Sequence, residues 1–297
     1  MDLPALIVGG DSTIGRAVGR CLEGRGFAVE RTSRRAGAAA AGRVELDLAR
    51  ELDPGLLAGR RFSVAVFCAA VASQEACRAD PAGSREVNVV RTAQLARRLA
   101  DGGTFLVHLS TNLVFDGSRP HPAEDDAACP RTEYGRQKAE AEEAVRRCTA
   151  QSAVIRLTKV LHGNLPLLAA WRRDLGAGRP VRAFGNVPCS VLELGAAADG
   201  IALVAARRAR GVWHFSNAED IRYTGLAAAL ARRLNAPAGL VRAAEGAGGE
   251  GGSQARFAAL GARRAAGELC IQFHDTASVI RAVVAADARA PVGAGRG

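Results

Sequence analysis

The stretch Ala5-Leu6-Ile7-Val8-Gly9-Gly10-Asp11-Ser12-Thr13-Ile14-Gly15 decides the fold class of this chain. Its first four residues form a short apolar run, which is typical of a buried β-strand. Glycines follow at once, and residues 13–24 then read as an α-helix. A glycine-rich turn between a first strand and a first helix lets the backbone approach a pyrophosphate, whose charge the helix N-terminus stabilises. The stretch therefore predicts a dinucleotide site at the start of an α/β domain.

Strand and helix signals alternate along the first half of the chain. After residues 5–8, strands are expected at 27–32, 44–46, 62–67, 104–109 and 153–157, and long helices at 82–100 and 133–148. This rhythm predicts a parallel sheet with helices on both faces, which is the Rossmann-type, doubly wound α/β fold. Beyond residue 157 the pattern loosens, with helices expected at 164–176, 191–208, 223–234 and 275–286, a strand at 211–215, a low-complexity loop at 244–253 and a tail from 287.

Bulk composition limits the function classes open to the chain. Its 297 residues include 40 Lys and Arg against 30 Asp and Glu, a formal charge of +10 that fits either an anionic partner or a solvated basic surface. Because arginines occur in scattered pairs and aromatics make up only 4%, we expect the surface and no nucleic acid partner. No apolar run approaches the ~18 residues of a membrane span, so no membrane partner is expected. Seven scattered cysteines without metal-ligand spacing predict no metal site and reduced thiols in a cytoplasmic protein.

The end of the second expected strand bears on the choice between NADP and NAD. NAD-selective sites usually carry an acid there, which grips the ribose 2′-hydroxyl, whereas this chain reads Ser33-Arg34-Arg35. Two guanidiniums can clamp a 2′-phosphate, so we predict NADP(H), with NAD(H) as the less favoured alternative. In the glycine loop, Ser12 replaces the middle glycine, keeps the turn and can donate its hydroxyl to a phosphate. Asp47 is either a ligand of the adenine amino group or an ordinary turn residue.

Two of the rarest residue types in the chain form a pair. Tyrosine occurs only at positions 134 and 223 and lysine only at 138 and 159, yet Tyr134 and Lys138 stand four residues apart in the helix expected at 133–148. That spacing places both side chains on one helix face. A nearby ammonium stabilises a phenolate and lowers the tyrosine pKa from its usual value of ~10. Tyr134 can then exchange a proton with a substrate oxygen, while Lys138 can also hold the ribose hydroxyls of the cofactor.

A hydroxyl-rich segment, residues 110–117, follows the fifth expected strand. Ligands of such sheets bind beyond the carboxyl ends of the strands. Ser110 and Thr111 can therefore present a hydroxyl that binds the substrate oxygen and orients it against Tyr134. A Ser-Thr pair by itself is usually a turn, but with Tyr134 and Lys138 it completes a triad.

These pieces together resemble the extended short-chain dehydrogenase/reductase family, and most closely its dTDP-4-dehydrorhamnose reductase-like branch of sugar-nucleotide enzymes. The matching segments are residues 9–15, 67–70, 87–88, 110–117, Pro130 and the Tyr134/Lys138 pair. The resemblance implies that Thr111 is the catalytic hydroxyl, Tyr134 the acid/base and Lys138 its partner. It also implies an NADP-binding Rossmann domain over residues 1–157, a substrate-binding lobe mainly over 158–297 with segments that return to the first domain, and a homodimer. The cofactor-binding residues expected from the motifs and the resemblance are Gly9, Ser12, Thr13, Ile14, Gly15, Ser33, Arg34, Arg35, Asp47, Leu48, Ala69, Ala70, Val71, Tyr134 and Lys138.

The departures from the family pattern concern the substrate, for which Thr111, Asn112 and Lys159 are the expected contacts. The reductases usually read Ser-Thr-Asp-Tyr-Val-Phe, where this chain has Asn112-Leu113 in place of Asp-Tyr. They usually carry a Trp after the sixth strand, where this chain reads Arg156-Leu-Thr-Lys159. Lys159 is therefore either a contact for a phosphate or carboxylate of the substrate or a lysine exposed at a strand end.

Three functions remain open at this point. The main prediction is an NADPH-dependent reductase that acts on a keto-sugar, specifically a nucleotide-linked 4-keto-sugar. The second is an NAD(P)-dependent nucleotide-sugar epimerase or dehydratase that recycles its hydride, against which Asn112 and Leu113 provide no acid/base pair beside Thr111. The third is a non-catalytic NADP-binding regulatory subunit, which the altered substrate residues leave open.

Overall fold

The computed structural model describes residues 3–35, 37, 43–53, 55–163, 165–245 and 255–288. From residue 246 onward the expected low-complexity loop lies outside the described residues, and so does the expected tail from residue 289. Within the described part, no helix is long and apolar enough to cross a membrane. In the same residues, no three His, Cys, Asp or Glu side chains gather where they could hold a metal ion.

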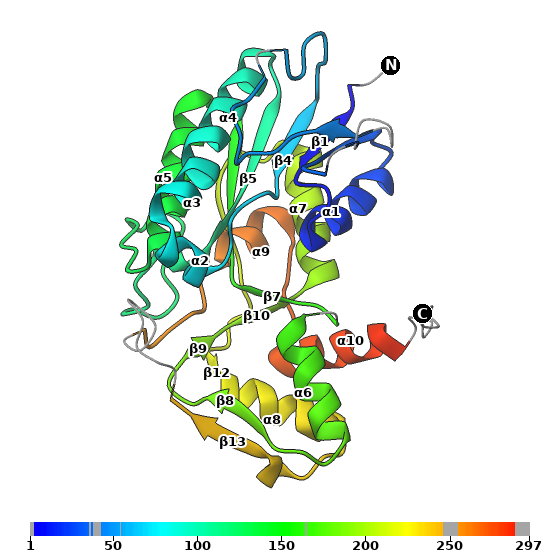
Figure 1. Ribbon diagram of the computed structural model, residues 1–297, viewed down its shortest axis with the longest axis vertical. Helices are drawn as coiled ribbons and strands as arrows, with labels where there is room; N and C mark the ends of the chain where they lie inside the picture. The colour runs from blue at the N-terminus through cyan, green and yellow to red at the C-terminus, as the bar shows by residue number, and fades with distance from the viewer. Residues whose placement is uncertain are drawn as a thin grey trace.

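A seven-stranded parallel sheet forms the upper part of the molecule (Figure 1). Its strand order is β11-β6-β5-β4-β1-β2-β3, and every neighbouring pair is parallel. The order reverses beside β1, which is the place where doubly wound sheets bind their ligands. The Rossmann-type fold predicted from the sequence is thus confirmed. The strands are β1 (Ala5–Val8), β2 (Val29–Ser33), β3 (Val44–Glu45), β4 (Val64–Phe67), β5 (Phe105–Thr111), β6 (Ser152–Leu157) and β11 (Gly211–Phe215).

Helices cover both faces of this sheet (Figure 1). On one face α1 (Thr13–Glu23) packs against α7 (Leu194–Arg207), and on the other α4 (Thr92–Asp101) packs against α5 (Glu133–Cys148). The strands between them are apolar on both sides because alternate side chains enter opposite cores. Ile7 of β1 joins the core under α1 and α7, whereas Leu6 joins the core that includes side chains of α4 and α5.

The helix expected at 82–100 is interrupted in the structure. A short helix α2 (Gln74–Ala79) precedes α3 (Pro81–Arg85), a π-helical turn η2 (Glu86–Arg91) follows, and α4 then completes the run. Pro81 begins α3 because it needs no amide hydrogen bond at a first helical position, and Asp80 caps the helix through the Gly83 amide. Such π-turns occur frequently at functional sites, and this one carries Asn88 towards the loop after β4.

The lower part of the molecule has its own apolar core and three small two-stranded sheets (Figure 1). The strands β7 (Lys159–Leu161) and β10 (Val191–Glu193) are parallel, as are β8 (Val181–Phe184) and β13 (Val241–Ala244), whereas β9 (Pro188–Cys189) and β12 (Ile221–Arg222) are antiparallel. The helices are α6 (Pro166–Gly176), α8 (Tyr223–Arg233) and α10 (Thr276–Ala288). The expected helix at 191–208 is wrong over its first three residues, because residues 191–193 pair with β7.

The chain returns from this lower part to the sheet. After β10 it forms α7, and β11 then extends the central sheet beside β6. The last return carries α9 (Arg263–Leu269) against β11, where Arg264 stacks its guanidinium 4.0 Å from the Trp213 ring centroid. Ala265 and Leu269 of α9 enter the same core as α1 and α7.

A buried ion pair fixes α5 against the sheet. The side chains of Glu142 on α5 and Arg156 on β6 are each 4% exposed, and their closest nitrogen and oxygen atoms are 2.8 Å apart. The Ser110 hydroxyl at the end of β5 donates to the same carboxylate. On β11, burial and then the Arg156 charge lower the pKa of His214 to about 3, so this ring is neutral and its Nε2 can accept from Arg156 at 3.2 Å. One polar cluster thus joins α5 to three neighbouring strands.

We expect Gly9→Ala to destabilise the fold by roughly 2–4 kcal/mol, measured as the free energy of unfolding in urea. Gly9 has a φ of +85°, and a Cβ there would lie 2.7 Å from the backbone nitrogen of Ala69. Gly26 has the same φ with nothing within 4 Å of its Cβ position, so Gly26→Ala should cost only about 1–2 kcal/mol. Equal losses in the two variants would show that the contact with Ala69 contributes nothing.

Glu142→Ala should lower the free energy of unfolding by about 3–5 kcal/mol, because it leaves the buried Arg156 guanidinium without its counter-charge. The neighbouring Glu143 is the matched control, since it forms only exposed pairs with Arg146 and Arg147 at 3.7 and 3.6 Å. Glu143→Ala should change stability by less than about 1 kcal/mol. Denaturant titration of both variants checks the difference, and a Glu142→Ala loss as small as the control would contradict it.

Candidate active site

The glycine loop forms a tight turn between β1 and α1. The Gly9 amide donates to Thr32 Oγ1 at 2.8 Å, and the Gly10 amide donates to the Thr32 carbonyl at 3.0 Å, so β2 holds the turn in place. Ser12 caps α1, and its hydroxyl oxygen accepts from the Gly15 amide at 2.9 Å. A Cβ on Gly15 would lie 2.4 Å from the Gly9 carbonyl oxygen, so only glycine fits there.

This loop fits the pyrophosphate of a dinucleotide. The amides of Thr13 and Ile14 stand in the first turn of α1, where no helical carbonyl precedes them to accept their hydrogen bonds. The positive end of the helix dipole lies at the same place. The Ser12 oxygen completes the helix cap as an acceptor, which leaves its O–H available to donate, so the expected contact with a phosphate stays a prediction.

The expected residues Ser33, Arg34 and Arg35 lie at the end of β2. Two side chains that the sequence did not indicate, Asp11 and Arg43, lie beside them. Ser33 is buried, and Arg34 and Arg35 are exposed. Asp11 of the glycine loop accepts from the Ser33 hydroxyl at 2.5 Å and lies 3.9 Å from the Arg35 guanidinium. Arg43 makes an ion pair with the same carboxylate. Nothing local marks Arg43, since it reaches the site only because β3 pairs with β2.

The loop after β4 meets the glycine loop at Ala69, whose backbone touches Gly9. Ala70 is exposed. Val71 makes two backbone hydrogen bonds with the Asn88 side chain: its amide donates to Asn88 Oδ1 at 2.8 Å, and its carbonyl accepts from Asn88 Nδ2 at 3.1 Å. Asn88 in turn donates to Gln137 of α5 at 2.8 Å. This buried amide thereby links the predicted cofactor loop to the helix that carries the tyrosine.

Asp47 and Leu48 occupy a turn after β3. The Asp47 carboxylate accepts from the Ala49 amide at 3.0 Å and lies 3.7 Å from Arg50, so it stabilises its own turn. Leu48 is buried in the core on the α4 side of the sheet. These contacts fit a turn residue, and the contact of Asp47 with an adenine amino group stays a prediction.

Tyr134 and Lys138 lie one turn apart on α5, as expected. Lys138 is buried and donates to His108 Nε2 of β5 at 2.9 Å. Burial lowers the pKa of Lys138 to about 8, which Glu142 one turn further along opposes. Burial, and then the Lys138 charge, hold the pKa of His108 well below its usual range, so the ring is neutral with its proton on Nδ1. No described residue accepts a hydrogen bond from that buried Nδ1.

Tyr134 differs from the expectation in its acidity. Lys138 was expected to lower the pKa of Tyr134, but desolvation raises that pKa above its usual value. The phenol is therefore protonated at neutral pH, so it can give a proton, although it is a weaker acid than a free tyrosine. His108, which the sequence did not indicate, shares β5 with Thr111 three residues further on.

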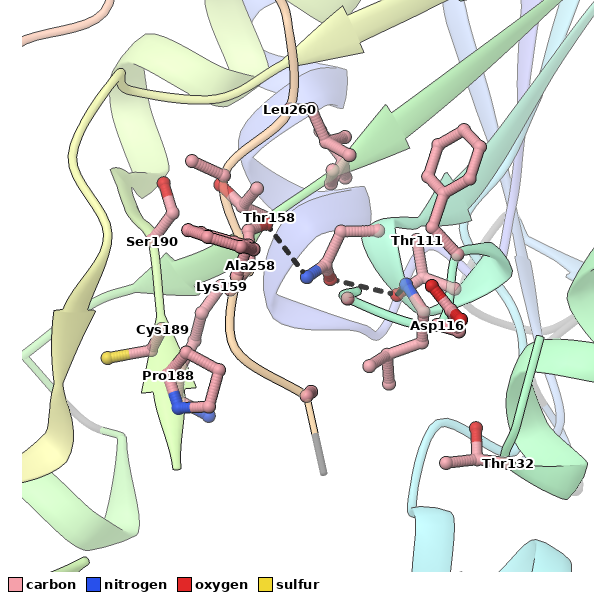
Figure 2. Close-up of a pocket in the computed structure, with 18 of the residues that line it drawn as sticks. Thr111, Asp116, Thr132, Thr158, Lys159, Pro188, Cys189, Ser190, Ala258 and Leu260 are labelled. Carbon is pink, nitrogen blue, oxygen red and sulfur yellow. Dashed lines mark hydrogen bonds between the residues drawn. The ribbon is translucent and has the colours of Figure 1, made fainter. Parts of the chain in front are cut away.

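A cavity of about 450 Å³ is lined by expected site residues from several elements of the fold (Figure 2). Ile14 of the glycine loop, Thr111 at the end of β5 and Tyr134 on α5 all line it. Lys159 and Cys189 line another part, where Lys159 Nζ stands 5.5 Å from the Tyr223 ring centroid. Burial raises the pKa of the Cys189 thiol to about 12 although Lys159 opposes the rise, so this thiol is not ionised at neutral pH.

A segment far along the sequence, residues 255–260, completes the cavity (Figure 2). The Asn112 amide donates to the Ala258 carbonyl at 3.0 Å, and Thr111 Oγ1 lies 3.4 Å from Asn112 Oδ1. Asp220 accepts from the amides of Ala258 and Ala259. The expected substrate residue Asn112 therefore holds this returning segment, which no local sequence signal indicated.

Three comparisons place the chain among known proteins. Residues 3–249 match the family described as RmlD substrate binding domain. The dTDP-4-dehydrorhamnose reductase of Streptomyces griseus is 30% identical over 240 residues, which cover 80% of this chain and 69% of that protein. Methionine adenosyltransferase 2 subunit beta of Rattus norvegicus is 34% identical over 105 residues, so the match spans 31% of its length and 35% of this chain.

Solved structures show the same fold. A dTDP-4-dehydrorhamnose reductase from Bacillus anthracis str. Ames, crystallised in complex with NADP, superposes with a TM-score of 0.81. That superposition covers 96% of this chain and 99% of the other, at 16% identity, so it speaks for the fold alone. The family match extends over most of the sequence and thereby confirms the resemblance to the dTDP-4-dehydrorhamnose reductase-like branch. The chain belongs to the RmlD substrate binding domain family.

Proposed function

We propose that this protein is an NADPH-dependent reductase of a nucleotide-linked 4-keto-sugar. One observation carries the proposal: a single cavity is lined by the glycine loop through Ile14, by the Thr111 hydroxyl and by the protonated Tyr134. A cofactor loop, a hydrogen-bond donor and a proton donor are the parts that carbonyl reduction needs at one place. The Streptomyces griseus relative, named a dTDP-4-dehydrorhamnose reductase, supports the same class of reaction.

The residues divide the chemistry among them. NADPH, when bound at the glycine loop, supplies a hydride to the carbonyl carbon. Thr111 donates a hydrogen bond to the carbonyl oxygen and orients it, and Tyr134 gives that oxygen its phenolic proton. The Lys138 ammonium on the same helix face stabilises the negative charge that forms on the phenol as the proton leaves. His108 accepts a hydrogen bond from Lys138 and so fixes the position of the ammonium group.

Lys159 is proposed to bind the anionic part of the substrate. Its ammonium lines the cavity beside the Tyr223 ring, and a nucleotide-linked sugar brings phosphates to such a cation. Asn112 stands where the reductases usually have an acid, and it is held by Ala258.

We also propose the division of labour along the chain. Residues 1–157 would bind the coenzyme, and residues 158–297 would mainly bind substrate, with α7, β11 and α9 returned to the sheet. The apolar core of the lower part, which is separate from the cores on the two faces of the sheet, supports this division. The homodimer implied by the resemblance and the cytoplasmic location indicated by the scattered cysteines both stay predictions.

A binding subunit without turnover is a second candidate. The likeness to methionine adenosyltransferase 2 subunit beta favours it, because that relative is named as one subunit of an enzyme. The two functions separate in one experiment, in which NADPH oxidation is followed with a panel of 4-keto nucleotide sugars. Turnover of any of them supports the reductase, whereas tight NADPH binding with no turnover and one stoichiometric partner in a pull-down supports the binding subunit.

Tyr134→Phe should leave the Kd for NADPH within about threefold and lower kcat by about 10²–10⁴-fold, because it removes the proton donor alone. Coenzyme binding is measured by titration and turnover by NADPH absorbance. Tyr223→Phe removes the same hydroxyl from the other tyrosine that lines the cavity, and it should cost far less in kcat. Retained turnover in Tyr134→Phe would refute the mechanism.

The pH profile should show an alkaline limb set by Lys138. Since the pKa of Lys138 is lowered to about 8, its ammonium is present below that pH, and kcat/KM should fall as pH rises through about 8. Lys138→Arg keeps a positive charge at every working pH, so its profile should lack this limb. A limb at the same pH in Lys138→Arg would assign the titration to another group.

A further inference from the structure

An acid lies at the carboxyl end of β2 although the last residue of that strand is Ser33. Doubly wound sites selective for NAD place a carboxylate at this strand end to accept from the ribose 2′-hydroxyl. Here Ser33 occupies the strand position, and the carboxylate comes from Asp11 in the glycine loop. The two side chains are joined by a hydrogen bond of 2.5 Å from Ser33 Oγ to Asp11 Oδ2.

The same carboxylate contacts Arg35, one of the two arginines expected to take a 2′-phosphate, and Arg43, which was not expected. Asp11 Oδ2 lies 3.9 Å from Arg35 Nε, and Asp11 Oδ1 pairs with Arg43 Nη1. The hydrogen bond from Ser33, followed by the charges of Arg43 and Arg35, lowers the pKa of Asp11 against the effect of its partial burial. The carboxylate is therefore ionised at neutral pH, forms a close ion pair with Arg43 and lies near the mostly exposed Arg35 guanidinium.

The shape of the glycine loop does not depend on this acid. Ser12 caps α1, and the amides of Gly9 and Gly10 bond to Thr32, so none of these contacts uses the Asp11 side chain. An asparagine at position 11 has nearly the same shape and can still accept from Ser33. The negative charge of Asp11 therefore has a role separate from the folding of the loop.

We propose that Asp11 sets the coenzyme selectivity of this protein, by competing with the 2′-phosphate for Arg35 and Arg43 and by accepting from the ribose 2′-hydroxyl when that phosphate is absent. The inference rests on the proposed function and adds the residue that limits its preference for NADPH. A like charge beside the phosphate weakens NADPH binding and leaves NADH binding unharmed. The preference for NADPH is then smaller than the arginines alone would give.

The test is the ratio of two dissociation constants, Kd for NADH over Kd for NADPH, measured by fluorescence titration or calorimetry on the full chain. Asp11→Asn should raise this ratio about tenfold, because it removes one negative charge from a half-exposed phosphate site. Arg43→Ala should lower the ratio in the otherwise unchanged protein, since it removes a cation that the phosphate would use. This second variant tests the cation side of the competition even if Asp11→Asn folds poorly.

Asp199→Asn is the matched control. Asp199 lies on α7, is 62% exposed and pairs with Arg25 at 2.8 Å, so the substitution makes the same charge change at an arginine pair away from the glycine loop. Its ratio should stay within about twofold of the unchanged protein. An unchanged or lowered ratio in Asp11→Asn, or an unchanged ratio in Arg43→Ala, overturns the inference while NADPH-dependent turnover stands. Failure of the unchanged protein to bind either coenzyme overturns the proposed function together with the inference.

Discussion

The ion pair between Glu142 and Arg156 is the interaction on which the geometry of the site depends. Both side chains are almost completely buried, and together they attach α5 to β6. Ser110 donates to the same carboxylate, and the next residue along β5 is Thr111. Contacts with the Glu142 carboxylate therefore position both the helix that carries the proposed proton donor and the strand that carries the proposed hydroxyl. Such a pair contributes little net stability compared with apolar packing, but it selects one arrangement of helix and sheet.

The same carboxylate also affects the charge of Lys138. Glu142 follows Lys138 by one helical turn and favours its ammonium, whereas burial disfavours it. His108 accepts from that ammonium only because its own ring is kept neutral. The buried Lys138 ammonium thus has the neutral His108 ring as its hydrogen-bond acceptor. The Glu142 carboxylate, which also binds Arg156, lies nearby. This balance places the Lys138 pKa at about 8, so the ammonium persists at neutral pH.

The sequence predicted those parts of the site that depend on local chemistry. The glycine loop follows its strand directly, and Tyr134 and Lys138 fall one helical turn apart, so spacing alone reveals them. Asp11, Arg43 and His108 were missed because their roles come from contacts between elements, across 22, 32 and 30 residues of sequence. The short strands of the lower part were missed for the same reason. Two to four residues carry too little periodicity, and it is a partner from elsewhere in the chain that makes them strands.

The unusual basicity of the chain explains why an acid at the coenzyme site matters. With 38 arginines and a formal charge of +10, the protein attracts phosphates of many kinds, and the attraction alone does not distinguish one nucleotide from another. Discrimination requires a group that penalises one ligand as well as groups that reward the other. Asp11 is placed for that role, because its partners are the guanidiniums of Arg35 and Arg43 and its hydrogen bond to Ser33 keeps it charged. In a protein this rich in arginine, one carboxylate at the coenzyme site distinguishes NADPH from NADH more effectively than another cation would.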